Sequence, residues 1–470
     1  MILALVLLPV FAGLTLLLVP QAGRMVSKAV AAIVAAAVFV LALRSNGEAV
    51  TAHWLYRPFA ANFHFANSGI SFWIILLLAL CTFCAVLATN VPRTRTFLAL
   101  LLLLEGTMAG VFLARDLLVF ALFWDLMLLP VFFCLIGWGE HPAVAWRYLI
   151  YNFAGGLTLL LATAAFGIDF GSTDVIGASG LHHLGNVWQS WIFAGFAFAF
   201  LVKTPVWPFH TWMPPTYAGT PSPMVAVVSA VQSKAGLYGF IVVGLTLLPE
   251  SMHAAALLMM WLGVIALLYG AFAALVQTDM KRIVAYSSLS HLGLILLAVF
   301  SFNPIALRGA LIYIIAHGLF SAALFLVLGY VEEREETRSL LRLGGLGREN
   351  PRIAGAFCIA ALAALGLPGL AGFAGEIVIL TGLYQSGNVV PAVLALVPIV
   401  LAAAYMLRLF QNVMNGPEIA DLPVRRDLTL AEGLALVPLL AAIVVIGVNP
   451  HMLTTFELTP YAVSAPAGTK

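Results

Sequence analysis

Residues 198–240, which read FAFLVKTPVWPFHTWMPPTYAGTPSPMVAVVSAVQSKAGLYGF, are the stretch around which the chain is organised. They place Lys203 and Lys234, each within an apolar segment typical of a helix, on either side of a proline-rich hinge. A lysine at bilayer depth costs about 2.5–3.5 kcal/mol on insertion scales, so it needs water, a partner or a function there. Proline removes a backbone hydrogen bond, and a helix broken at that depth must pack within protein or line a wet cavity. We therefore expect Lys203 to face a polar interior.

The composition is that of a protein that crosses a membrane many times. Hydrophobic residues make up 63% of the 470 residues and charged residues only 9%, and the mean hydropathy is +1.05. Spanning a bilayer core takes about 20 apolar residues, and the sequence supplies such segments almost end to end. The net charge of +2 gives no basic face that would bind nucleic acid. We predict an all-α polytopic membrane protein whose surroundings are the lipid bilayer.

No pattern for a cofactor or a metal site is found in the sequence. The close pair of cysteines, Cys81 and Cys84, has no second pair and no histidines at metal-ligand spacing. All four cysteines lie in apolar runs, so we expect them to pack in the core and not to hold an iron–sulfur cluster. A dinucleotide fingerprint is also missing, which argues against a bound flavin or nicotinamide.

Fourteen apolar segments have the length and character of transmembrane helices. Their approximate ranges are 2–20, 25–43, 69–90, 97–114, 117–138, 143–167, 189–209, 220–247, 255–277, 281–301, 305–330, 353–384, 390–412 and 429–448. Loops after odd-numbered segments carry fifteen lysines and arginines, against five on the other side. Because cytoplasmic loops carry the excess of positive charge, both termini are predicted on the extracytoplasmic side.

Segments four to eight correspond to segments nine to thirteen. Segment seven is interrupted next to Lys203, and segment twelve, five segments later, is interrupted at residues 365–372, just before Glu376. An offset of five segments inverts orientation in the membrane, so the two units are expected to form an inverted repeat with broken helices at equivalent places. The predicted parts are residues 1–96 (helices one to three with an extracytoplasmic loop), 97–247 (first repeat), 255–412 (second repeat) and 413–470 (helix fourteen and tail).

Ionisable residues that fall well inside these segments form the candidate site. They are Glu105, Asp125, Lys203, Lys234, His291, His317 and Glu376. Proton transfer needs groups whose protonation can change, and burial beside an opposite charge tunes that change. Because the set is spread over segments four to twelve, it predicts a relay of titratable groups that crosses the protein sideways, with Asp125 as the partner of Lys203.

Each of these residues also has a structural interpretation. His291 would serve equally well by bonding a backbone carbonyl, and Glu105 by bonding a neighbouring helix as a protonated acid. A structural ion pair would explain Lys203 with Asp125, but not several charges spread over both halves. Arg408, near the end of segment thirteen, is better explained by a side chain that reaches the cytoplasmic interface.

Several longer motifs resemble one known family. They are FWDLMLLPVFFCLIGWG (123–139), FLVKTPVWPFHTWMP (200–214), SKAGLYG (233–239), DMKRIVAYSSLSHLG (279–293), AHGLFSAALFLVLGYVEERE (316–335) and LGLPGLAGFAGEIVIL (365–380). Together they resemble the antiporter-like subunits of bacterial respiratory complex I, over residues 69–412. The chain is most similar to the subunit M family, because Glu376 supplies an acid where the relatives usually carry lysine.

The resemblance implies fourteen helices, two inverted five-helix repeats broken in helices seven and twelve, and a hydrophilic axis that conducts protons. By position, it makes Asp125 the helix-five acid, Lys203 and Lys234 the helix-seven and helix-eight lysines, and Glu376 the helix-twelve acid. Glu105 matches an additional helix-four acid, and His291 and His317 match connecting histidines. The family normally has glutamate at helix five, so the shorter aspartate implies a longer or water-bridged contact with Lys203.

Our first hypothesis is a proton-translocating membrane subunit of a respiratory NADH-quinone oxidoreductase or a closely related redox-driven pump, without a redox site of its own. The resemblance implies that its partners are other membrane subunits, including neighbouring antiporter-like subunits, in the bacterial inner membrane. The alternative is a subunit of a Mrp-type multi-subunit cation/proton antiporter, which an ion gradient drives. A scaffold with a vestigial relay is the third reading. Glu376 in place of lysine favours the first hypothesis, the subunit of a redox-driven pump.

Overall fold

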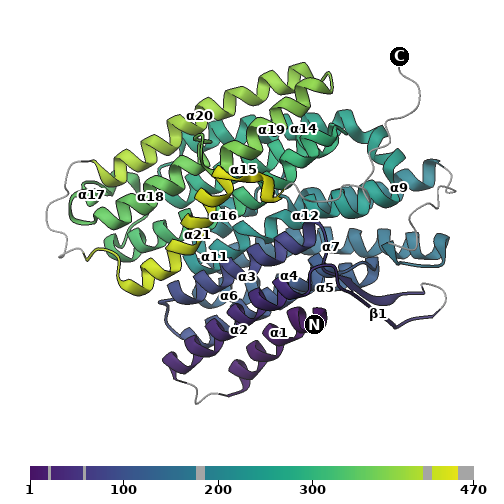
Figure 1. The fold of residues 1–470 in the computed structure, drawn as a ribbon, viewed down its shortest axis with the longest axis horizontal. Helices are drawn as coiled ribbons and strands as arrows, with labels where there is room; N and C mark the ends of the chain where they lie inside the picture. The colour runs from purple at the N-terminus through teal and green to yellow at the C-terminus, as the bar shows by residue number, and fades with distance from the viewer. Residues whose placement is uncertain (20–22, 57–59, 176–185, 417–425, 454–470) are drawn as a thin grey trace.

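The computed structural model describes residues 1–19, 23–56, 60–175, 186–416 and 426–453 as a bundle of long helices (Figure 1). Eleven described helical stretches are long and apolar enough to cross a membrane, and three apolar helices are shorter: Ile2–Leu18, Val187–Lys203 and Pro351–Ala364. Together they account for the fourteen predicted spans. The first half consists of α1 (Ile2–Leu18), α2 (Arg24–Arg44), α3 (Ile70–Ala88), α4 (Thr94–Leu113), α5 (Leu117–Leu126), α6 (Leu128–Trp138), α7 (Pro142–Phe170), α9 (Asn186–Lys203) and α10 (Met213–Gly219).

The second half begins with a helix that changes its winding several times. It comprises α11 (Ser222–Ala230), the 3₁₀ turn η1 (Gln232–Lys234), α12 (Ala235–Gly239), the π segment η2 (Phe240–Gly244) and α13 (Leu245–Leu247). The remaining elements are α14 (Pro249–Val276), α15 (Met280–Phe300), α16 (Pro304–Glu335), η3 (Leu340–Arg342), α17 (Leu346–Glu349), α18 (Pro351–Ala364), α19 (Ala371–Gln385), α20 (Val389–Met414), α21 (Leu430–Val448) and η4 (Pro450–Leu453).

The two predicted helix breaks are present. The first part of helix seven, α9, ends at Lys203, and the chain becomes helical again at Met213 as α10. The predicted end of this helix at residue 209 was therefore too late. Helix twelve is divided into α18 and α19 by residues 365–370. Gly366 and Gly369 have φ angles of 77° and 92°, a left-handed backbone that glycine adopts without steric cost. Both breaks therefore follow from proline and glycine in the sequence.

Two further features of the backbone were not predicted. The 3₁₀ turn that ends at Lys234 lies within a stretch that was predicted as one continuous helix. In addition, the loop between α2 and α3 contains an antiparallel hairpin of β1 (Ala49–His53) and β2 (Asn62–Ala66), in which Ala49 pairs with Ala66. The terminal amine of Met1 lies 3.4 Å from Glu48 Oε2, beside this hairpin.

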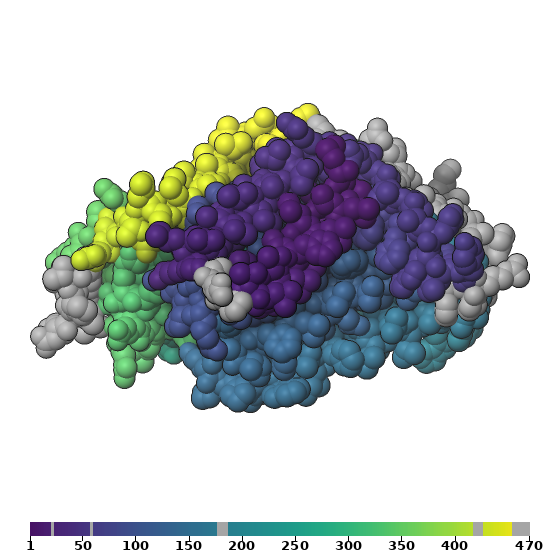
Figure 2. Space-filling model, turned by 90° about the horizontal axis from the view of Figure 1, so that it is seen from below, coloured from purple at the N-terminus to yellow at the C-terminus, as the bar shows by residue number. Residues whose placement is uncertain are grey.

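The central helices are buried and the outer ones face the surroundings. The stretches 222–247 and 304–335 are buried over their whole apolar window, whereas only about a third of the window is buried in α2, α20 and α21. Figure 1 shows α15 and α16 in the middle of the bundle, with α1 and α20 at opposite edges. Figure 2 shows α1 and α2, in purple, spread over one face between α21 and α7. Ionisable side chains on the central helices are therefore kept from lipid.

Candidate functional site

Lys234 lies at the end of the 3₁₀ turn that interrupts helix eight, and only 1% of it is exposed. Its ammonium donates to the Ser229 carbonyl at 2.5 Å and to His317 Nδ1 at 2.7 Å. In a regular helix the Ser229 carbonyl would be satisfied within the helix, so the irregular winding frees an acceptor for the lysine. The break in helix eight thus positions Lys234 against α16.

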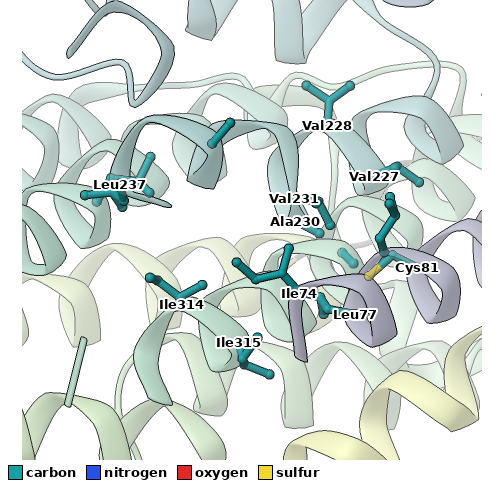
Figure 3. Close-up of a cluster of buried hydrophobic side chains, with 14 of the residues drawn as sticks. Ile74, Leu77, Cys81, Val227, Val228, Ala230, Val231, Leu237, Ile314 and Ile315 are labelled. Carbon is teal, nitrogen blue, oxygen red and sulfur yellow. The ribbon is translucent and has the colours of Figure 1, made fainter. Parts of the chain in front are cut away.

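A cluster of buried apolar side chains lies beside this break. It consists of Ile74, Leu77 and Cys81 of α3, Val227 and Val231 beside the break, and Ile314 and Ile315 of α16 (Figure 3). At the same level, a Cβ on Gly318 would lie 2.4 Å from Leu77 Cδ2 and 2.9 Å from the Ala230 carbonyl. Only glycine allows the three helices to approach so closely. Lys234 and His317 are correspondingly buried, with 1% and 0% exposed.

From His317 the polar groups continue across α15 and α16 to helix twelve. The His317 and His291 rings lie 5.5 Å apart between centroids, with no hydrogen bond joining the two imidazoles. His291 Nδ1 lies 2.5 Å from the Tyr313 hydroxyl, which donates to Glu376 Oε1 at 2.5 Å. When Glu376 is ionised, the single Tyr313 proton is given to it, and His291 Nδ1 is then the donor to the tyrosine oxygen. We call Lys234, His317, His291, Tyr313 and Glu376 the bonded chain.

A side branch fixes the orientation of His291. Its Nε2 lies 3.1 Å from the Ser287 hydroxyl, and the Ser287 hydroxyl lies 2.9 Å from that of Tyr405 on α20. With Nδ1 protonated in the neutral ring, Nε2 is an acceptor and Ser287 donates to it. The branch therefore holds the His291 tautomer that the bonded chain requires.

Glu376 is placed by the break in helix twelve. It lies one turn inside α19 and is 5% exposed. A Cβ on Gly366 would lie 2.2 Å from Glu376 Oε2, so the glycine that turns the backbone also makes room for the carboxylate. The predicted pairing of a broken helix with this acid is therefore a direct contact.

Lys203 and Asp125 are arranged differently. Lys203 ends α9, is 1% exposed, and its ammonium lies 5.1 Å from the centre of the Trp124 ring, within cation–π range. No ion pair within 4.0 Å joins it to Asp125, and its Nζ has no hydrogen-bond partner among the residues that the structure describes. Asp125 packs against Gly156 of α7, where a Cβ would lie 1.8 Å from Asp125 Oδ1. Asp125 and Lys203 are therefore not within ion-pair distance of each other, and the water-bridged contact stays a prediction.

The surroundings of Lys203 contain polar atoms that need water. Within the described ranges, Thr204 Oγ1, Gln232 Oε1 and Asp125 Oδ1 are buried without a hydrogen-bond partner. A Cβ on Gly236 would lie 2.2 Å from Thr204 Oγ1, so the break in helix seven packs directly on the break in helix eight. Buried polar groups are almost always satisfied by protein or by ordered water. Asp125 also lines a cavity of 470 Å³ whose other walls are apolar.

Glu105 lies apart from both groups. It is fully buried in α4, and neither carboxylate oxygen has a hydrogen-bond partner in the described part of the chain. Its neighbour Gly106 packs on Val6 and Val10 of α1, which shows that α4 faces the first helix there. The structure thus does not connect Glu105 to the bonded chain through any described contact.

Comparison with known proteins agrees with this arrangement. The family profile described as "NADH:quinone oxidoreductase/Mrp antiporter, TM" matches residues 114–402, more than half of the chain. The chain belongs to this family.

Members of the family from bacteria cover most of the sequence. The chain is 33% identical over 417 residues to NADH-quinone oxidoreductase subunit M of Rickettsia prowazekii, which covers 86% of this chain and 84% of the relative. Its fold matches a chain of respiratory complex I from Thermus thermophilus with a TM-score of 0.89, 31% identity and 98% coverage of both chains. The predicted resemblance and the predicted fold class, with its inverted five-helix repeats, are confirmed.

A third match extends the fold beyond complex I. A chain of the Mrp complex from Dietzia sp. DQ12-45-1b matches with a TM-score of 0.85 and 20% identity, over 98% of this chain and 96% of that one. At this identity the match shows a shared fold and no more.

Within this family member, three residues of the site were missed by sequence reasoning: Tyr313, Ser287 and Tyr405. Tyr313 lies one helical turn before His317, and Ser287 one turn before His291, so both pairs share a helix face. That i, i+4 spacing was the available signal. Tyr405 carried no such signal because its partner lies on another helix.

Arg408 donates to the Leu275 and Gln277 carbonyls and so caps the end of α14. The sequence predicted that its side chain reaches the cytoplasmic interface.

Proposed function

We propose that this chain is the M-type membrane subunit of a respiratory NADH-quinone oxidoreductase, and that it translocates protons through the buried groups described above. The bonded chain is the observation that carries the proposal. It brings together a buried lysine, two histidines, a tyrosine and a buried acid, all of them groups that exchange protons, with hydrogen bonds on either side of the 5.5 Å between the imidazole centroids. The family membership supports the same function.

In this mechanism, a proton that reaches Lys234 passes to His317 Nδ1. The His317 ring then releases its other proton from Nε2 to His291 Nε2, across the 5.5 Å between the ring centroids, as the Ser287 hydroxyl turns away from that nitrogen. His291 then gives its Nδ1 proton to the Tyr313 oxygen while Tyr313 delivers its own proton to Glu376 Oε1. Each hydroxyl or ring thus gains one proton as it loses another. Asp125 and Lys203 form a separate pair whose charges alternate during transfer, and water bridges the distance between them.

The resulting role is that of a translocase without redox chemistry of its own. Electron transfer takes place elsewhere in the assembly, and the partners are other membrane subunits, including neighbouring antiporter-like ones. The excess of lysine and arginine on one side assigns that side to the cytoplasm and both termini to the opposite side of a bacterial inner membrane.

A Lys203→Ala variant tests the proposal in inverted membrane vesicles of the host. NADH-driven acidification of the vesicle lumen should be lost, while the amount of assembled complex stays at the parent level. Lys28→Ala is the matched control, because Lys28 donates to the Leu87 carbonyl away from the site, and it should pump normally. Near-parent pumping by a fully assembled Lys203→Ala complex would contradict the relay.

Co-purification separates this function from the Mrp alternative. The proposal predicts that flavin- and iron–sulfur-containing subunits leave the membrane with this chain. A complex that lacks redox subunits and exchanges sodium for protons without NADH would establish the antiporter instead.

A further inference from the structure

A charged cavity of 260 Å³ opens on the lysine- and arginine-rich side of the molecule, away from the bonded chain. Its walls come from the ends of α3 and α6, the junction of α10 and α11, the start of α15 and the end of α16. Three carboxylates and two cations line it: Glu140, Glu332, Glu333, Lys281 and Arg338. The lining is thus net negative, which disfavours an anionic ligand and concentrates cations and protons.

Lys281 is the most deeply placed charge in this cavity. Only 2% of its side chain is exposed, and its ammonium lies 2.5 Å from Glu332 Oε2 and 3.4 Å from the Thr220 carbonyl. Glu332, which is 30% exposed, is the member of the pair that meets water. Opening the pair leaves the Lys281 ammonium with the Thr220 carbonyl in place of the carboxylate, so the pair is expected to stay closed while Glu332 is anionic.

Arg338 ties the cavity rim together. It binds Glu140 Oε1 at 2.7 Å and Asp279 Oδ2 at 3.3 Å, and it reaches Glu332 Oε1 at 3.7 Å. Asp279 in turn caps α15 by accepting from the Lys281 and Arg282 backbone amides. On the other wall, Asn90 donates to Glu333 Oε2 at 3.4 Å. Glu332 is therefore the carboxylate held between Lys281 and Arg338.

The floor of the cavity contains a buried hydroxyl group, that of Ser222. Ser222, at the start of α11, is 6% exposed, and its hydroxyl has no hydrogen-bond partner among the described residues. Gly329 of α16 lies opposite, where a Cβ would be 2.4 Å from Ser222 Cβ. An unsatisfied buried hydroxyl at a cavity wall is a position for an ordered water.

Ser222 also lies on the face of α11 that leads to Lys234. Ser229 follows seven residues later, two helical turns and about 10 Å along the axis, and its carbonyl accepts from the Lys234 ammonium. On α16, Ser321 and His317 lie eight and twelve residues before Gly329 on one i, i+4 row, with Phe325 between Gly329 and Ser321. Two facing helices thus lead from the cavity floor to the start of the bonded chain.

We propose that this cavity is the intake port for protons bound for Lys234, with Glu332 as the proton acceptor and the Lys281–Glu332 ion pair as its closure. The inference rests on the proposed function and adds the place where protons leave the cytoplasmic water. A proton from water adds to Glu332 Oε2, and the ion pair with the Lys281 ammonium opens. The proton then passes to water at Ser222, Glu332 becomes anionic again, and the pair re-forms with Lys281 still protonated.

Inverted vesicles test this port because the buffer then sets the pH at the cytoplasmic face. A Glu332→Gln variant should slow NADH-driven pumping by about tenfold, since the amide cannot take a proton. The loss should deepen as the buffer becomes more alkaline, and Glu332→Asp should restore most of the rate. Glu333→Gln is the matched control, one residue along the same helix and lining the same cavity, and it should pump like the parent.

Ser222→Ala is the second variant, chosen because it removes a hydroxyl without a partner and so should not destabilise the fold. It should slow pumping by about threefold, the effect of one lost water contact, at unchanged thermal stability. Parent rates for both Glu332→Gln and Ser222→Ala at every buffer pH would overturn the port. If Lys203→Ala still abolishes pumping in that case, the proposed function stands and this inference alone fails.

Discussion

The two lysines of the central stretch are equally buried but are kept there in opposite ways. Lys234 is held by two short hydrogen bonds and begins a series of contacts that ends at Glu376. Among the described residues, Lys203 Nζ has the Trp124 ring within cation–π range and no hydrogen-bond partner, and Thr204 Oγ1 and Asp125 Oδ1 have none either. The first region is connected by protein groups except between the two imidazoles, where His317 Nε2 has no hydrogen-bond partner in the described part of the chain. In our mechanism, the second region depends on water. Both lysines are equally costly in a bilayer. Lys234 makes fixed hydrogen bonds, whereas Lys203 is free to change its contacts.

This difference predicts how the two regions respond to substitution. In the bonded chain, each member has a defined neighbour, so the loss of one group interrupts transfer. In our mechanism, water bridges Asp125 and Lys203 and adapts to their positions, so a change of one methylene should matter less than a change that excludes the carboxylate.

After the complete loss expected for Lys203→Ala, the next largest effect is expected at the end of the bonded chain. Glu376→Gln preserves an oxygen that accepts from Tyr313 but removes the exchangeable proton, so pumping should fall by about a hundredfold. The measurement is NADH-driven acidification of inverted vesicles at equal complex content. Glu250→Gln, an exposed acid at the start of α14, is the control and should have no effect. A Glu376→Gln complex that keeps half its rate would mean that protons leave the chain before helix twelve.

A second, smaller loss is expected for Tyr313→Phe, which removes the hydroxyl between His291 and Glu376. Two hydrogen bonds disappear and two buried groups are left unpaired, so pumping should fall by about tenfold. Tyr405→Phe removes a hydroxyl of the same kind from the side branch and should cost no more than about twofold. Equal losses in the two variants would show that Tyr313 supports structure and is not a step in transfer.

The comparison also shows what the sequence was able to predict. The breaks in helices seven and twelve were predicted because proline and glycine act locally on the backbone, wherever the helix is placed. Lys203, Lys234 and Glu376 stood out because charge is rare in apolar segments. Both kinds of signal are contained within a few consecutive residues.

Contacts between helices could not be predicted from the sequence. Tyr313 is an ordinary aromatic residue in an apolar helix until the structure places it between His291 and Glu376. No proline near Lys234 predicts the 3₁₀ turn there, and the turn packs against α3 and α16. Likewise, a sequence cannot show that Asp125 and Lys203 are too far apart for an ion pair, since that distance is set by α5, α7 and α9 together.

Gly156→Ala sharpens the comparison at the water-dependent end. A Cβ there would overlap Asp125 Oδ1, and overpacking of this kind costs about 1–3 kcal/mol unless the carboxylate moves. Pumping should fall several-fold because Asp125 is pushed away from its position. Gly155→Ala is the matched control, since its Cβ would meet Ala199 Cα at an ordinary 3.4 Å, and it should be close to neutral. Equal behaviour of the two variants would mean that the position of Asp125 does not matter.

The smallest effect is expected for Asp125→Glu. The added methylene lengthens the acid toward the reach that the family normally has, and the 470 Å³ cavity beside Asp125 gives it room. Since water already bridges the gap to Lys203 in our mechanism, pumping should stay at the parent rate or rise modestly. An inactive Asp125→Glu complex, assembled in normal amount, would show that the shorter acid is fitted to its own site. The region around Lys203 would then be as rigid as the bonded chain, and the distinction between the two would fail.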